Sequence, residues 1–184
     1  ITLDEIYDNL VDGFDVDQML ADYMKNREIE LEERYCSPRK TGTELYQFAK
    51  YLGKRVIITS DMYLPREVIG KILADNGFDD YEQLFLSSEL KISKSTGSLF
   101  YYVHKKVGCK ARDIVHVDDN EHVLDIARSC GFKVSHLPKA SEVFDRYGLV
   151  AKLFGTYNAY ASFFFGYQTA LGVVANKVFD NPFT

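Results

Sequence analysis

The sequence predicts an α/β protein built on a doubly wound parallel sheet. Between residues 53 and 138, four short apolar runs alternate with amphipathic helical segments. Glycines close three of these helical segments, at Gly53, Gly77 and Gly108, and glycine is favoured just past the end of a helix. Short helix-to-strand connections repeated in this way are typical of a parallel sheet covered by helices on both faces, a Rossmann-like arrangement.

The individual elements follow from local patterns. Thr2 and Glu5 have the spacing of a capping box, so they predict a helix at the start of the sequence. Residues 16–35 carry apolar side chains at helical spacing, and the charged run "REIELEER" is expected to be mostly a solvated face. Thr43 is expected to cap the next helix, and Pro65 to begin another. The expected strands are 54–59, 83–88, 113–117 and 133–137, and the expected later helices are 44–53, 65–77, 95–108 and 121–131.

These elements divide the chain into three parts. Residues 1–40 form a helical piece outside the sheet, residues 41–140 hold the strands, and residues 141–184 are expected to be helical and rich in aromatic side chains. The uncharged stretch 153–176 has the length of a membrane span. Polar residues and tyrosines interrupt it, whereas membrane spans are more uniformly apolar. We therefore expect buried helices there, or a surface that docks an adjoining domain, rather than a membrane span.

Composition and charge exclude several classes of function. The chain has 184 residues, a net charge of −5 and no basic stripe, so nucleic acid is not expected as a partner. The three cysteines, Cys36, Cys109 and Cys130, lie far apart. Their spacing argues against a disulfide framework and a zinc site, and it favours a reducing compartment such as the cytoplasm. The first ten residues lack both the features of a signal peptide and an initiating Met. The sequence is therefore expected to begin partway through a longer chain.

Polar side chains follow two of the expected strands at their carboxyl ends. Thr59, Ser60 and Asp61 close the first strand, and Asp118 and Asp119 follow the third. Ligands bind at this edge of an open parallel sheet. Two adjacent carboxylates are costly in a low-dielectric crevice unless a cation compensates their charge. Mg²⁺ is usually held by one or two carboxylates together with phosphate and water, so the acid pair predicts a magnesium site.

A lysine-containing stretch, "ELKISKSTG", follows the second strand. An ammonium such as Lys94 and a hydroxyl such as Ser60 are groups that hold phosphoryl oxygens, and with the acid pair they describe metal-assisted phosphoryl transfer. Singly, each group has an ordinary interpretation. The acids can be a turn or a helix N-cap, Ser60 and Asp61 can be turn residues, and Lys94 can be solvated, with Lys91 as a nearby alternative. Their common position on one sheet edge favours a site.

These motifs resemble those of the haloacid dehalogenase (HAD) superfamily of phosphatases. "VIITS" is similar to the second family motif, with Ser60 as the hydroxyl, and "KISKSTGSLF" to the third, with Lys94 as the lysine. "IVHVDDNEHVLDIARSCGF" is similar to the fourth motif in its adjacent-acid form, Asp118 and Asp119. Asp125 is then expected to be a helix surface residue. "TSDMYLP" and "VANKVFDNPF" look like a branch found in or beside bacterial glycosyltransferase and surface-polysaccharide proteins.

The resemblance implies a Mg²⁺-dependent phosphohydrolase that works through an aspartyl-phosphate. It assigns the metal to Asp118 and Asp119, of which Asp119 is also catalytic, and it assigns charge stabilisation to Lys94. It implies a cap in residues 1–40 that excludes water and selects a phosphorylated small molecule, here one related to sugars. The substrate-binding residues that it implies are Thr59, Ser60 and Asp61.

The first family motif, which supplies the nucleophilic aspartate, is not found in the sequence. In the family this motif lies on the central strand, between the strands that carry the second and fourth motifs. Without that strand, its two neighbours would lose backbone hydrogen-bond partners. The nucleophile is therefore expected upstream of Ile1. A circular permutation with Asp180 as nucleophile is disfavoured, because Pro182 would remove a bond from a central strand.

Two other classes of protein share parts of this pattern. A receiver domain of two-component signalling uses similar groups, but its acid pair comes first along the chain, whereas here the acids come last. A non-catalytic docking or regulatory module of a larger glycosyltransferase-associated protein could keep the same fold. The four histidines do not repeat at metal-binding spacing, and His116 is expected to be a packed or hydrogen-bonded core residue rather than a metal ligand.

Overall fold

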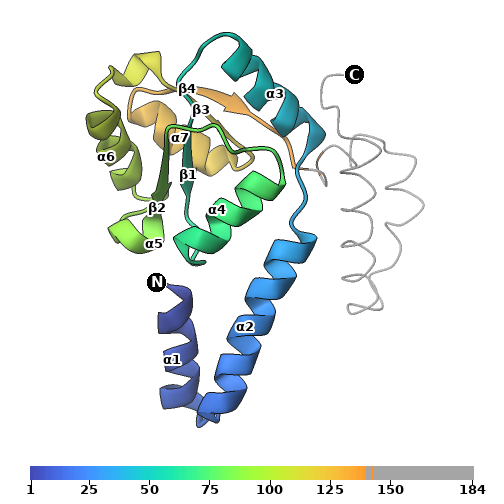
Figure 1. The fold of residues 1–184 in the computed structure, drawn as a ribbon. Helices are drawn as coiled ribbons and strands as arrows, with labels where there is room; N and C mark the ends of the chain where they lie inside the picture. The colour runs from blue at the N-terminus through green and yellow to red at the C-terminus, as the bar shows by residue number, and fades with distance from the viewer. Residues whose placement is uncertain (140–141, 143–184) are drawn as a thin grey trace, which may run out of the picture.

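The structure is a computed structural model that describes residues 1–139 and 142. A helical hairpin at the N-terminus leads into an α/β body (Figure 1). This alternation of helices and parallel strands confirms the predicted Rossmann-like α/β class. The strands are β1 (Ile57–Ser60), β2 (Gln83–Leu86), β3 (Val115–Asp118) and β4 (Lys133–His136). The helices are α1 (Leu3–Phe14), α2 (Gln18–Tyr35), α3 (Lys40–Tyr51), α4 (Arg66–Asp75), α5 (Ser87–Leu90), α6 (Ser98–Val107), the 3₁₀ helix η1 (Ala111–Asp113) and α7 (Glu121–Ser129).

The four strands form two parallel pairs rather than one continuous sheet. In the first pair, Ser60 at the end of β1 lies opposite Leu86 of β2. In the second pair, Asp118 at the end of β3 lies opposite His136 of β4. Within residues 1–139 and 142, no strand joins β1 to β3, so each of them has one backbone edge without a ladder partner there. The missing first family motif predicts a gap at this place, between the strands of the second and fourth motifs.

The side chains of β2 alternate between two hydrophobic clusters. Leu84 and Leu86 belong to a cluster that includes Val68 of α4, while Phe85 belongs to a second cluster with Leu99 of α6. This period of two is the ordinary geometry of a strand, whose successive side chains point to opposite faces. Helices α4 and α6 therefore cover opposite faces of the β1–β2 pair.

Helix α6 also joins the two strand pairs. Its buried Leu99, Val103 and Val107 pack in the cluster beside β2. Phe100, one residue further around the helix, packs in a third cluster with Val123 of α7. Since α7 contacts both β3 and β4, the apolar packing of α6 holds the second strand pair against the first.

The N-terminal hairpin of α1 and α2 packs against the body through its buried residues. Leu3, Tyr7 and Ala21 belong to the same hydrophobic cluster as the α4 side of the body. The predicted capping box is confirmed, because the Thr2 hydroxyl accepts from the Glu5 N–H at 3.2 Å and the Glu5 carboxylate accepts from the Thr2 N–H at 2.8 Å. The hairpin lies beyond the carboxyl ends of β1 and β2 (Figure 1).

Several predicted boundaries differ from the observed ones, among them those of α3, α4 and β2. Helix α3 begins at Lys40, before Thr43, whose hydroxyl bonds the Arg39 carbonyl at 3.1 Å within the first turn instead of capping the helix. Pro65 is the residue before α4 rather than its first residue. Strand β2 ends at Leu86, because the short helix α5 begins at the next residue.

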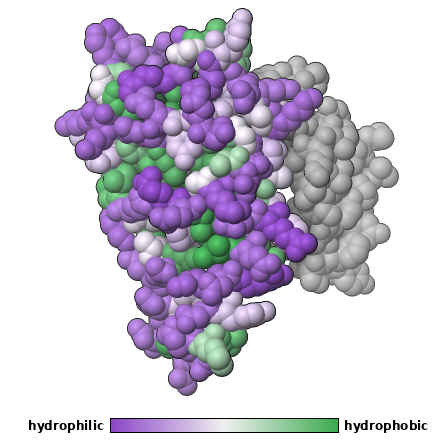
Figure 2. Space-filling model, viewed as in Figure 1, coloured by the Kyte–Doolittle hydropathy of each residue, from purple (hydrophilic) through white to green (hydrophobic). Residues whose placement is uncertain are grey.

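The surface is mostly hydrophilic on the face shown in Figure 2, with hydrophobic side chains gathered in patches in the middle of the view. No helix among residues 1–139 and 142 is long and apolar enough to cross a membrane. The predictions for residues 141–184, including the stretch 153–176 and the residue Asp180, lie outside the described residues, apart from Glu142.

Candidate active site

The end of β1 and the loop that follows it hold the first group of predicted site residues. Thr59 lies opposite Phe85 in the strand pair, and Ser60 is the last residue of β1. The Ser60 Oγ accepts a hydrogen bond from the Met62 N–H at 3.1 Å. This bond uses an acceptor site of the hydroxyl and leaves its proton available for donation to another group.

Asp61 joins this loop to the segment before α6. Its two carboxylate oxygens each lie 3.2 Å from the backbone N of Lys94. The sequence alone favours Asp61 as a turn residue and also allows a contact with substrate. The structure places its carboxylate between two loops of the same sheet edge, so one role of Asp61 is to hold Lys94 beside the end of β1.

The Lys94 side chain reaches the end of β3. Its Nζ lies 2.7 Å from Asp118 Oδ2, and the side chains of Lys94 and Asp118 are only 16% and 9% exposed. A charge-assisted hydrogen bond of this length, largely shielded from water, is stronger than the same pair on a surface. The predicted lysine and one predicted acid are therefore in direct contact.

The Asp118 carboxylate has two further partners, which fix its orientation. Its Oδ1 accepts from the Asn120 N–H at 2.9 Å, and its Oδ2 lies 3.3 Å from His116 Nε2. Burial by itself would raise the pKa of the Asp118 carboxyl. The hydrogen bonds from His116, Lys94 and Asn120 outweigh that effect and hold the pKa well below its usual range. Asp118 is therefore a carboxylate at physiological pH.

Asp119 is exposed, and its carboxylate makes no hydrogen bond or ion pair within the described part of the chain. It follows β3 directly, one residue beyond Asp118. Asp118 and Asp119 thus differ in role, since one is held by three donors and the other is open to solvent. Among residues 1–139 and 142, no group of three or more His, Cys, Asp or Glu side chains is arranged to hold a metal ion.

His116 lies beside these residues, as the packed or hydrogen-bonded core residue that the sequence predicts. It is buried, as expected, and its ring packs edge-on against Phe100 with centroids 4.8 Å apart. Its ring nitrogen also contacts the Asp118 carboxylate. The spacing of two residues on one strand is the feature that could have indicated this contact, because residues i and i+2 share a face.

Two charged residues near these motifs, Lys91 and Asp125, have partners elsewhere. Lys91 pairs with Glu5 of α1 at 2.7 Å, so it points to the hairpin rather than to Asp118. Asp125 pairs with Arg128 on the exposed side of α7, in agreement with its expected surface role. Of the two lysines in this segment, only Lys94 contacts an acid of the fourth motif.

Comparisons with known proteins identify the fold. A scan against protein-family models and a search of curated proteins find no match. Among solved structures, a HAD-family enzyme from Bacteroides thetaiotaomicron matches with a TM-score of 0.55 and 18% identity, over 74% of this chain and 67% of that one. A predicted phosphoglycolate phosphatase from Haemophilus somnus 129pt matches with a TM-score of 0.54 and 19% identity, over 73% of this chain and 62% of that one. This chain has a HAD-like fold.

The HAD-like fold agrees with the family resemblance of the sequence motifs. A third neighbour, a dehalogenase whose structure holds an intermediate complex, matches with a TM-score of 0.55 and 18% identity. The match covers 70% of this chain but only 55% of the dehalogenase chain. The chain therefore spans roughly half to two thirds of the HAD-like proteins that it matches.

Proposed function

We infer that the intact protein is a phosphohydrolase that transfers a phosphoryl group to an aspartate and then to water. The contact between Lys94 and Asp118 carries this proposal, because it brings the lysine of one predicted motif to the acid of another on a single sheet edge. Asp61 binds the backbone of the same lysine, so the loop that holds Ser60 belongs to the same assembly.

Ser60 and Lys94 are proposed to bind the phosphoryl group. The Ser60 hydroxyl, whose oxygen already accepts from Met62, would donate its proton to a phosphoryl oxygen. The Lys94 ammonium would lie near the same oxygens and neutralise the charge that develops on them. Thr59 and Asp61, on either side of Ser60, would shape the loop that receives the substrate.

Asp118 and Asp119 are proposed to hold Mg²⁺, which would draw negative charge from the phosphoryl oxygens when bound. The two acids fit this role in part. Asp119 is an exposed carboxylate without a protein partner in the described residues, while Asp118 is ionised and held by Lys94, His116 and Asn120. Mg²⁺ commonly takes one or two carboxylates and completes its shell with water and phosphate. Two adjacent acids are enough for such a site.

The nucleophilic aspartate is proposed to lie on an extended strand between β1 and β3. Within the part of the chain that the structure describes, each of these two strands has one edge without a ladder partner, which supports this proposal. Two strands that flank a central strand lie about 10 Å apart. Lys94 can span this separation, because its backbone N–H binds Asp61 after β1 and its ammonium binds Asp118 at the end of β3. One face of β3 is also uncovered in the described part of the chain. Its residues Val115 and Val117 are exposed, whereas the strands of a parallel sheet are normally covered on both faces.

The substrate is proposed to be a phosphorylated small molecule related to sugars. The enzyme from Bacteroides thetaiotaomicron has been crystallised with magnesium and inorganic phosphate, which supports a phosphorylated ligand for this chain. The sugar relation depends on the resemblance of "TSDMYLP" to the glycosyltransferase-associated branch. The α1–α2 hairpin, beyond the carboxyl ends of β1 and β2, would act as part of a cap. Three free cysteines support a reducing compartment such as the cytoplasm.

Hydrolysis of an aryl phosphate by the intact protein, followed with increasing Mg²⁺, tests the proposal. Lys94→Met should lower kcat/KM by about 100-fold or more, since the loss of one charge-stabilising donor commonly has an effect of this size. Lys91→Met is the matched control, because Lys91 lies three residues away and pairs with Glu5 instead. Equal activity in the two variants, or hydrolysis that does not depend on Mg²⁺, would contradict these assignments.

A non-catalytic docking module is the second candidate. The ion pair between Lys94 and Asp118 favours it, because the lysine compensates the charge of this carboxylate without a metal. Such a module would bind an adjoining glycosyltransferase-type domain, with residues 153–176 as its proposed contact. Failure of the intact protein to hydrolyse any aryl or sugar phosphate would support this candidate over the enzyme.

A further inference from the structure

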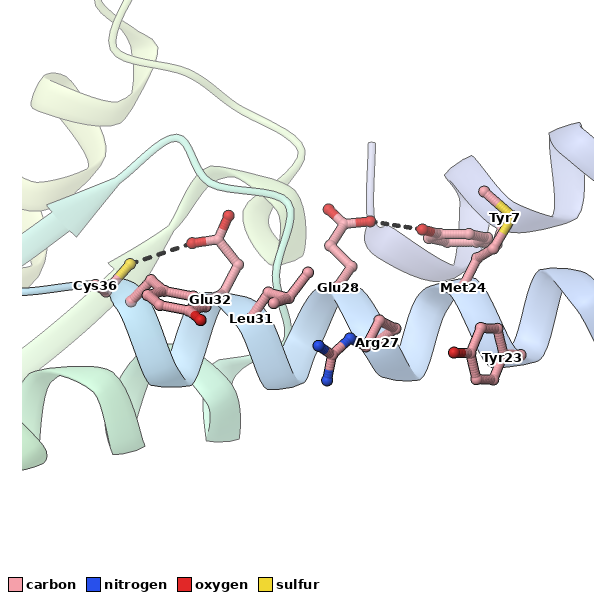
Figure 3. A pocket seen from close by; sticks show the side chains of 9 residues that line it. Tyr7, Tyr23, Met24, Arg27, Glu28, Leu31, Glu32 and Cys36 are labelled. Atoms are coloured by element: carbon pink, nitrogen blue, oxygen red, sulfur yellow. Dashed lines mark hydrogen bonds between the residues drawn. The ribbon is translucent and has the colours of Figure 1, made fainter. Parts of the chain in front are cut away.

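One carboxylate joins the N-terminal hairpin to the loop that follows β1. Glu28 of α2 accepts a hydrogen bond from the Tyr7 hydroxyl of α1 through Oε2, and from the Tyr63 hydroxyl through Oε1, each at 2.7 Å. Figure 3 shows the first of these bonds, with the Glu28 side chain extending from α2 toward Tyr7. Three segments that are distant in sequence thus meet at a single side chain.

Both tyrosines act as donors at physiological pH. Burial and the Glu28 carboxylate raise the pKa of Tyr7 to about 12. The hydrogen bond to Glu28, together with burial, raises the pKa of Tyr63 to about 12. Hydrogen bonds from neutral donors to a carboxylate are stronger than those between neutral groups, and they strengthen further when they are partly shielded from water. The two bonds to Glu28 therefore hold their partners firmly.

Tyr63 lies close to the proposed phosphate-binding residues along the chain. It follows Ser60 by three residues, and its carbonyl accepts from the Leu3 N–H of α1 at 2.9 Å. The next residue, Leu64, is almost fully buried. The loop is therefore bound to the hairpin at Tyr63 by both its backbone and its side chain, while Asp61 binds it to Lys94 on the other side.

A second side-chain contact between the hairpin and this sheet edge is weaker. Lys91 pairs with Glu5, but the two side chains are 57% and 48% exposed. Exposed ion pairs contribute little and are screened by salt. Beside the backbone bond between Leu3 and Tyr63, the Glu28 contact is thus the principal side-chain connection between the hairpin and the β1 loop in the described part of the chain.

We propose that Glu28 and Tyr63 are positioning residues for the Ser60 loop, so that the orientation of the hairpin sets the placement of the phosphate-binding hydroxyl. This inference rests on the proposed phosphohydrolase function of the same sheet edge. Neither residue touches the phosphoryl group. Glu28 acts through Tyr63, and Tyr63 acts through the three residues that separate it from Ser60.

Two tyrosine variants separate positioning from simple stabilisation. Tyr63→Phe removes the bond between Glu28 and the loop, while Tyr7→Phe removes the bond between the same carboxylate and α1. Each variant loses one hydroxyl, so a merely structural role predicts similar effects of both. The proposal predicts that Tyr63→Phe lowers kcat about tenfold and changes KM by less than about threefold, because small misplacements of a reacting group are costly. Tyr7→Phe should keep kcat within about twofold of the wild type.

Glu28 offers a conservative rescue. Glu28→Gln keeps the shape of the side chain, and its amide can accept from one tyrosine while donating to the other. Glu28→Ala keeps neither bond. The proposal predicts a loss of kcat in Glu28→Ala similar to that in Tyr63→Phe, with most of the activity restored in Glu28→Gln.

Backbone hydrogen exchange of residues 60–68 in the full chain tests the proposal without turnover. Exchange in this peptide should be at least about threefold faster in Tyr63→Phe and Glu28→Ala than in the wild type and Tyr7→Phe, because local opening sets the exchange rate. If the wild type hydrolyses no phosphate, the proposed function fails while the exchange result still decides whether Glu28 holds the loop. Equal exchange and equal kcat in the two tyrosine variants would overturn the positioning role.

Discussion

Replacing Lys94 with methionine would remove the ammonium from a mostly buried ion pair and leave Asp118 as a carboxylate with fewer partners. The Asp118 side chain is only 9% exposed, so it cannot recover its hydration without a local rearrangement. Breaking one side of a buried pair typically costs 3–5 kcal/mol. Since His116 and the Asn120 N–H still contact the carboxylate, we expect a cost near the lower limit, about 3 kcal/mol.

Urea denaturation of the full chain, followed by far-UV circular dichroism, measures this cost. For a protein of this size, a loss of about 3 kcal/mol corresponds to a fall of roughly 6–12 °C in Tm. The double variant Lys94→Met/Asp118→Asn should recover much of the loss, because it removes the unpaired charge together with its partner. A cost below about 1 kcal/mol for Lys94→Met, or a double variant no more stable than the single one, would refute the reasoning.

Three further predictions concern stability. The raised pKa values of Tyr7 and Tyr63 mean that their contribution is fully present below pH 10 and is lost as pH rises toward about 12; alkaline denaturation should therefore be less steep in Glu28→Ala. The lowered pKa of Asp118 means that its contribution is present above about pH 4 and is lost as pH falls, so acid denaturation should be less steep in Asp118→Asn. Gly97→Ala should cost about 1–3 kcal/mol in thermal unfolding, because φ is +76° there and the added Cβ would lie 3.2 Å from a cysteine sulfur; a change below 0.5 kcal/mol would contradict this.

The order of elements and the common sheet edge could be predicted because they depend on local patterns. Apolar runs, glycines at helix ends and the capping box of Thr2 each act over a few residues. The carboxyl ends of parallel strands meet at one edge of the sheet. The sequence alone therefore predicts that Lys94 and Asp118 lie near each other. Their 2.7 Å contact agrees with that expectation.

The residues that the sequence did not indicate have partners far away along the chain. Glu28 lies in a charged run that suggests a solvated face, yet its partners Tyr7 and Tyr63 are 21 and 35 residues distant. The choice between Lys91 and Lys94 depends on backbone direction. Lys91 has a φ of +54° at the end of α5 and pairs with the hairpin. Such tertiary contacts have no period or motif that a single sequence displays.

The most direct test of the proposed phosphohydrolase function is hydrolysis of an aryl phosphate by the intact protein with Mg²⁺. The rates of the Asp119→Asn and Asp125→Asn variants are compared with that of the wild type. Both variants replace one carboxylate by an amide within seven consecutive residues, but Asp119 is the proposed metal ligand and Asp125 pairs with Arg128 on the helix surface. We predict that Asp119→Asn lowers kcat by at least about 100-fold and that Asp125→Asn stays within about twofold of the wild type. Equal turnover in the two variants, or no turnover in the wild type, would contradict it.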